Sequence, residues 1–141
     1  MDKIETAQRC KDALLESDKA SRGLGIKIEV REPGAAIAVM KVREDMMNGF
    51  DGCHGGLIFT LADTAFAFAC NGYNEQTVAA AGHIDFIRPA ILGDELTASA
   101  TEDYRGRKNG YYTIVVQNQE QELVALFRGR SSRSGKAIYD V

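Results

Sequence analysis

The sequence has no tryptophan, only two prolines and two histidines, and three cysteines, none of them in a C-x-x-C pair. Cys10, Cys53 and Cys70 are odd in number and widely spaced, which excludes a disulfide framework and indicates free thiols in a reducing compartment. With His54 and His83 as the only imidazole ligands, we expect no metal site and no cofactor.

An excess of positive charge is also missing. The net charge is -3 and the pI is about 5.4, so we expect neither nucleic acid nor an anionic membrane as a partner. Residues 1–19 are polar and mixed in charge, unlike a secretory signal. The one long apolar run, residues 55–72, contains Asp63, which makes a membrane span costly. We therefore expect one cytoplasmic domain over residues 1–141.

The spacing of apolar residues predicts a helix, two strands, an apolar helix and four strands. The expected ranges are an amphipathic helix over 2–20 within an N-terminal segment 1–22, strands over 26–31 and 36–43, the apolar helix, strands over 77–88, 95–104, 111–119 and 122–132, and a loose tail over 134–141. Short connections favour antiparallel pairing of consecutive strands. A helix that is apolar nearly all round must be wrapped on most sides, as a strongly curved sheet does.

Asp63 is the only charged residue in the apolar run, and burying a carboxylate costs several kcal/mol unless something compensates. The run begins with Gly55 and Gly56, where a helix presents unpaired N–H groups and the positive end of its dipole. Glycines there allow a substrate carbonyl to approach the backbone. Together these features indicate catalysis.

Four motifs resemble the acyl-CoA thioesterases of phenylacetic acid degradation, which have the hotdog fold. They are Asn48-Gly-Phe-Asp-Gly-Cys-His54-Gly-Gly, Leu61-Ala-Asp63-Thr-Ala-Phe-Ala, Asp85-Phe-Ile-Arg-Pro89-Ala-Ile-Leu-Gly93-Asp94 and Val124-Ala-Leu-Phe-Arg-Gly129. The resemblance implies an α+β fold in which a curved antiparallel sheet wraps one long central helix. It also implies hydrolysis of an aryl-acetyl or related acyl-CoA to the free acid and CoA.

By the same resemblance, the amide of Gly55 forms the oxyanion hole, His54 holds or polarises the carbonyl, and Asn48 orients a water or the carboxylate. Asp63, which we expect to be ionised at neutral pH, acts as nucleophile or as general base. Asp63 follows Gly55 by eight residues, about 12 Å along a helix, so the two cannot meet at one carbonyl. The site should therefore combine Gly55 of one subunit with Asp63 of another in a homodimer, and the resemblance adds a homotetramer.

An acidic chain needs a local basic cluster to bind the phosphates of CoA. The candidates lie in one hairpin and near the last strand: Arg105, Arg107, Lys108, Arg128, Arg130 and Arg133, with Arg88 a weaker one. Phe59, Phe66 and Phe68 are candidates for an acyl pocket that suits a ring.

Structural explanations stay open for most of these residues. Asp63 could be satisfied by Thr60 or by backbone, His54 could cap the helix, and Asn48 could serve only its turn. The basic hairpin could be solvated, the helix phenylalanines could be core, and His83 beside Asp85 could be structural. Cys53 adjoins His54, but neighbouring side chains rarely point together, so we do not expect a cysteine nucleophile.

Two other functions are compatible with such a fold. A hydratase or dehydratase of acyl thioesters would pair a histidine with an acidic residue further along the helix, often with a proline, and this spacing and proline are absent. A non-catalytic acyl-CoA-binding protein would keep the basic residues but would not need Asp63.

Overall fold

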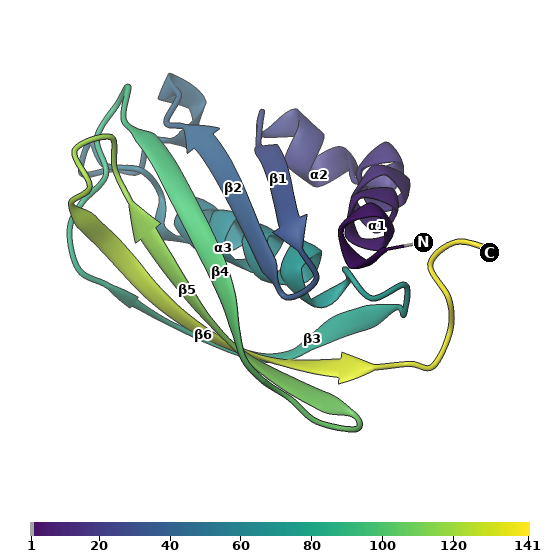
Figure 1. The fold of residues 1–141 in the computed structure, drawn as a ribbon. Coiled ribbons are helices and arrows are strands. Elements are labelled where there is room, and N and C mark those ends of the chain that lie inside the picture. The colour runs from purple at the N-terminus through teal and green to yellow at the C-terminus, as the bar shows by residue number, and fades with distance from the viewer. Residues whose placement is uncertain (1) are drawn as a thin grey trace.

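A computed structural model describes residues 2–141 (Figure 1). Its helices and strands are, in chain order, α1 (Lys3–Ser17), α2 (Lys19–Gly23), β1 (Lys27–Glu32), β2 (Ala35–Lys41), the 3-10 helix η1 (Glu44–Met46), α3 (Gly55–Cys70), β3 (Thr77–Phe86), β4 (Glu95–Arg105), β5 (Asn109–Gln117) and β6 (Leu123–Arg133). The predicted order of helices and strands is confirmed, with boundaries shifted by a few residues.

The six strands form one antiparallel sheet in the order β1-β2-β4-β5-β6-β3. The sheet curves around α3, and α1 lies beside β1 at the open side (Figure 1). Buried residues of α3, among them Leu61, Ala65 and Phe66, meet buried residues of the strands in one core. The α+β hotdog fold predicted from the apolar helix and from the motifs is confirmed.

One expectation about strand pairing is wrong. β3 and β4 are consecutive and joined by the short segment 87–94, yet they do not pair: β3 pairs with β6, and β4 lies between β2 and β5. The segment crosses the start of α3 instead of reversing beside β3. The N–H of Cys53 donates to the carbonyl of Ala90 at 2.7 Å, and Val42 exchanges backbone hydrogen bonds with Gly93 and Asp94. These contacts leave β3 at the edge of the sheet.

The N-terminal helix is divided at Asp18. Its carboxylate accepts hydrogen bonds from the N–H and the hydroxyl of Ser21 and so caps α2. Residues 134–141 form no regular structure, but the side-chain oxygen of Asn74 accepts hydrogen bonds from the N–H groups of Ile138 and Tyr139. The expected looseness of this tail stays a prediction.

Within residues 2–141, no helix is long and apolar enough to cross a membrane. The longest helix of this range, α3, has 16 residues.

Candidate active site

α3 begins at Gly55, and His54 is its N-cap. The Nδ1 atom of His54 accepts a hydrogen bond from the N–H of Gly56 at 3.1 Å, which confirms the capping role left open by the sequence. Because Nδ1 is the acceptor, a neutral His54 ring carries its proton on Nε2. The ring is exposed, so this second nitrogen remains available as a donor.

The N–H of Gly55 has no acceptor among residues 2–141, in contrast to that of Gly56. It is therefore an unpaired donor at the positive end of the helix dipole. Gly55 lines a cavity of about 390 Å³, together with Asn48, Phe50, Gly52, Cys53, Ile58, Phe86, Ile87, Arg88, Pro89 and Ala90. A volume of this size accommodates a small organic group.

Asn48 holds the loop that leads to α3. Its side-chain oxygen accepts hydrogen bonds from the N–H groups of Phe50 at 2.8 Å and Gly52 at 3.1 Å, which supports the left-handed backbone of Asp51, with φ of 59°. The turn role of Asn48 is thus confirmed. No residue in the described range accepts a hydrogen bond from its side-chain nitrogen, and Asn48 lines the same cavity as Gly55.

Asp63 lies half-buried on α3, and no donor within residues 2–141 hydrogen-bonds to its carboxylate. Thr60 does not satisfy it, because the Thr60 hydroxyl donates to the carbonyl of Gly56 at 2.9 Å. Burial raises the pKa of the Asp63 carboxyl above its ordinary value, since desolvation penalises the charged form. The carboxylate is therefore without a hydrogen-bond donor among residues 2–141.

The single chain brings only three of the four predicted catalytic residues together. Asn48, His54 and Gly55 gather at the start of α3, whereas Asp63 is eight residues further along one continuous helix. The axial separation is about 12 Å, so Asp63 and the N–H of Gly55 do not converge within one protomer.

Four of the predicted basic residues, Arg105, Arg107, Lys108 and Arg133, form one cluster, and Arg128 and Arg88 lie apart from it. Glu75 links two members of the cluster, because Arg105 and Arg133 each approach its carboxylate to 3.7 Å. Arg105 also stacks over Tyr73, with 3.8 Å from the guanidinium carbon to the ring centroid. Arg133 also donates to the carbonyls of the hairpin residues Arg107 and Lys108.

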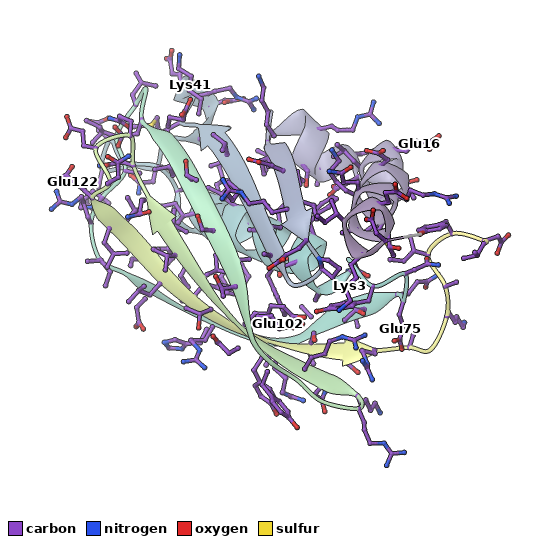
Figure 2. The ribbon with its side chains drawn as sticks, in the orientation of Figure 1. Lys3, Glu16, Lys41, Glu75, Glu102 and Glu122 are labelled. Atoms are coloured by element: carbon purple, nitrogen blue, oxygen red, sulfur yellow. The ribbon has the colours of Figure 1, made fainter. Side chains whose placement is uncertain are left out.

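Arg128 lies apart from this cluster. It is exposed on the outer face of the sheet, 3.8 Å from Asp103. At the other end of the sheet Arg88 pairs with Glu122 at 2.8 Å, and Figure 2 shows Glu75 and Glu122 at opposite ends.

The aromatic residues of the cavity are not those that the sequence indicated. Phe66 and Phe68 are buried in the core, and Phe59 packs edge-on against Phe127 with ring centroids 5.1 Å apart. Phe86 and Phe50 line the cavity instead. The signal for Phe86 was its place at the end of an alternating strand, beside the Arg-Pro turn.

The alternative acid–base pair of His83 and Asp85 lies outside this cavity. His83 and Asp85 form an exposed pair on β3, 3.2 Å apart. In residues 2–141, no three His, Cys, Asp or Glu side chains are grouped so that they could hold a metal ion.

The fold and the site define a hotdog-fold protein whose central helix presents an unpaired backbone donor beside a largely apolar cavity. The thioesterase superfamily matches residues 50–125. The acyl-coenzyme A thioesterase PaaI of Escherichia coli K12 is 48% identical over 126 residues, which are 89% of this chain and 90% of PaaI. The chain therefore belongs to the thioesterase superfamily.

Two solved structures extend the comparison. The PaaI protein from the phenylacetic acid degradation operon of E. coli has a TM-score of 0.94 and 44% identity, covering 96% of this chain and 99% of that one. The smu.793 protein of Streptococcus mutans, solved with bound acetyl CoA, has a TM-score of 0.76 and 25% identity, covering 79% and 90%. The assignment made from the sequence motifs is confirmed.

Proposed function

We propose that this chain, an acyl-CoA thioesterase of the PaaI type, hydrolyses aryl-acetyl or related acyl-CoA thioesters at a site shared between two subunits. The observation that carries the proposal is the unpaired N–H of Gly55 beside the cavity, together with an Asp63 carboxylate that no donor of its own chain satisfies. The names of the relatives favour this activity over a hydratase or a non-catalytic binding protein.

The N–H of Gly55 donates to the thioester oxygen, and its hydrogen bond strengthens as negative charge develops there. The side-chain nitrogen of Asn48 is a further donor at the same cavity. The exposed His54, next to Gly55, offers its Nε2–H as a donor from outside the cavity lining. The CoA is part of the substrate, and no other cofactor is needed for the step.

Asp63 supplies the second half of the reaction in one of two ways. As a nucleophile, it adds to the carbonyl carbon and CoA leaves as the thiolate, after which water hydrolyses the mixed anhydride. As a general base, it takes a proton from water while the hydroxyl adds and the C–S bond breaks. In a single turnover in H₂¹⁸O, label enters Asp63 only by the first path.

The edge strand β3 is the surface on which we place the dimer. It offers ten residues with a free edge, and its positions 78–83 are all exposed in the single chain. Val78, Ala79, Ala80, Ala81 and Gly82 are small or apolar, and a long uncharged edge of this kind is a template for pairing with another strand.

The catalytic residues determine where the two-fold axis should pass. For Gly55 of one subunit to lie level with Asp63 of the other, the axis must pass level with residue 59, midway between them. The ring of Phe59 lies against Gly82, 3.4 Å from where a Cβ would stand. The two β3 strands should therefore pair antiparallel with Gly82 near the axis.

The same pairing gives the basic residues a role. Within one chain, Arg133 and the hairpin 105–108 lie at the Thr77 end of β3, whereas Gly55 lies at its Phe86 end. The two ends are about 26 Å apart along the strand. Antiparallel pairing brings the Thr77 end of one β3 beside the Phe86 end of the other. Arg105, Arg107, Lys108 and Arg133 of one subunit are then our candidates to bind the CoA phosphates at the partner's Gly55, with Arg128 on the outer face a separate candidate.

Subunit complementation tests this proposal. Asp63→Ala removes the carboxylate and should be inactive alone. Gly55→Pro removes the backbone N–H and should alone keep no more than about 1% of the wild-type activity. In a mixed dimer, Gly55 of the first subunit meets Asp63 of the second, so one of two sites is intact. After denaturation and refolding together, half of the dimers are mixed, and the activity should return to about a quarter of the wild-type value. A site contained in one subunit would give no recovery.

A further inference from the structure

We propose that Phe86 is a specificity-determining residue, whose ring forms the wall against which the acyl group lies and selects aromatic over saturated acyl groups. This inference rests on the function proposed above, because it takes the thioester carbonyl to be bound at the N–H of Gly55.

The backbone around Phe86 is held on both sides. Phe86 is the last residue of β3 and pairs with Ala125 of β6. The next two residues, Ile87 and Arg88, both donate their N–H groups to the carbonyl of Val124, at 2.8 and 3.2 Å. Phe86 also lies on the same face of the strand as Ile84, which packs against the core, so its ring points toward α3.

The tip of the ring rests on Gly55. A Cβ built on Gly55 would stand 3.1 Å from Cζ of Phe86 and 3.4 and 3.6 Å from its two Cε atoms. The ring therefore covers the α-carbon adjacent to the proposed oxyanion donor. The ring thus lies beside the residue whose N–H would bind the carbonyl oxygen, and we place the acyl group against this ring.

The free part of the ring faces solvent and the cavity, since Phe86 is 53% exposed in the single chain. The cavity behind it is largely apolar: Ile58, Cys53 and Ala90 line it and are buried. Apolar walls favour any hydrophobic acyl group. Phe86 adds a preference for an acyl group that carries an aromatic ring. A pair of aromatic rings is stabilised more than its buried apolar area alone accounts for, by an amount equivalent to roughly two- to twelve-fold in binding.

The test compares two substrates of nearly equal size, phenylacetyl-CoA and cyclohexylacetyl-CoA, by the release of free thiol. In Phe86→Leu, the ratio of kcat/KM for the aromatic to the saturated substrate should fall by about two- to twelve-fold. Tyr104→Leu, which removes an exposed aromatic ring from β4 outside the cavity, is the matched control and should leave the ratio unchanged. Phe86→Tyr keeps the ring and should keep the ratio.

The outcomes separate this inference from the proposed function. An unchanged ratio in Phe86→Leu, with both substrates still hydrolysed, overturns the role of Phe86 alone. A wild-type enzyme that releases thiol from neither substrate overturns the proposed function instead. Phe86→Met removes the ring with an unbranched side chain, and it provides the same comparison if Phe86→Leu fails to fold.

Discussion

The role of the Gly55 amide can be tested by removing its hydrogen without changing the helix. Gly55→Pro deletes the N–H at the first position of α3, where no intrahelical hydrogen bond is lost and proline is well tolerated. The preceding residue, His54, has φ of -58° and ψ of 129°, an extended conformation compatible with a following proline.

The expected loss follows from the chemistry of the oxyanion. Removal of one such donor lowers kcat by roughly 10²- to 10³-fold, equivalent to about 2.7–4 kcal/mol of transition-state stabilisation. Proline also adds a Cβ, which would stand 3.1 Å from the ring of Phe86. Gly55→Ala adds a Cβ at the same position but keeps the N–H, so it measures the steric effect alone. We expect Gly55→Ala to lose no more than about ten-fold, because the half-exposed ring can move by a few tenths of an ångström.

The assay is the release of CoA thiol at saturating substrate, with circular dichroism and size-exclusion chromatography to show that helix and assembly are retained. The difference in kcat between the proline and alanine variants reports the contribution of the N–H. Equal kcat values for the two variants would refute the assignment of Gly55 as the oxyanion donor, whatever the size of the common loss.

Three further predictions concern charge, packing and assembly. Burial raises the pKa of the Asp63 carboxyl above 3.8, so the protonated carboxyl stabilises the folded state; this stabilisation is fully present only below that value and is lost as pH rises through the raised pKa. Asp63→Asn should therefore have a higher Tm than wild type at neutral pH, and the difference should close on acidification. A difference in Tm that stays constant with pH would contradict this. The buried hydroxyl of Tyr112 donates to Glu102 at 2.7 Å, so Tyr112→Phe should lower the free energy of unfolding in urea by about 1.5–3 kcal/mol; no change would show that water replaces the bond. With the two-fold axis at Gly82, position 81 faces position 83 of the partner. Ala81→Cys combined with His83→Cys should therefore form an intersubunit disulfide on oxidation, and shifting one cysteine by a residue should abolish it. Monomers of the double variant on a non-reducing gel would disprove the register.

The elements that local sequence determines were predicted closely. The alternation of Ile26, Ile28 and Val30 predicted β1, and the uncharged run after His54 predicted α3. Such periodicities arise because one face of each element must be buried, and they are therefore written in neighbouring residues. Asp63 was conspicuous for the same reason, as a charge at a position where burial is costly.

Contacts between distant segments were predicted less well. Segment length suggested that β3 pairs with β4, but 87–94 crosses the start of α3 and β3 pairs with β6. Its place on the helix makes Phe59 a candidate for the acyl pocket, and this stays a prediction. The structure places the ring of Phe86, from a strand end 31 positions away in the chain, over Gly55. Helical spacing could not indicate this contact.

By itself, then, the sequence determined a buried helix with glycine at its start and one carboxylate at its middle, and it determined the strands that form the sheet around this helix. It determined these because propensity, periodicity and the cost of burying charge act over a few neighbouring residues. Tertiary structure alone decided that β3 lies at the edge, that Phe86 covers Gly55, and that Arg133 lies at the far end of the strand from them. These depend on which surfaces fit together across the whole chain, and no local pattern carries that information.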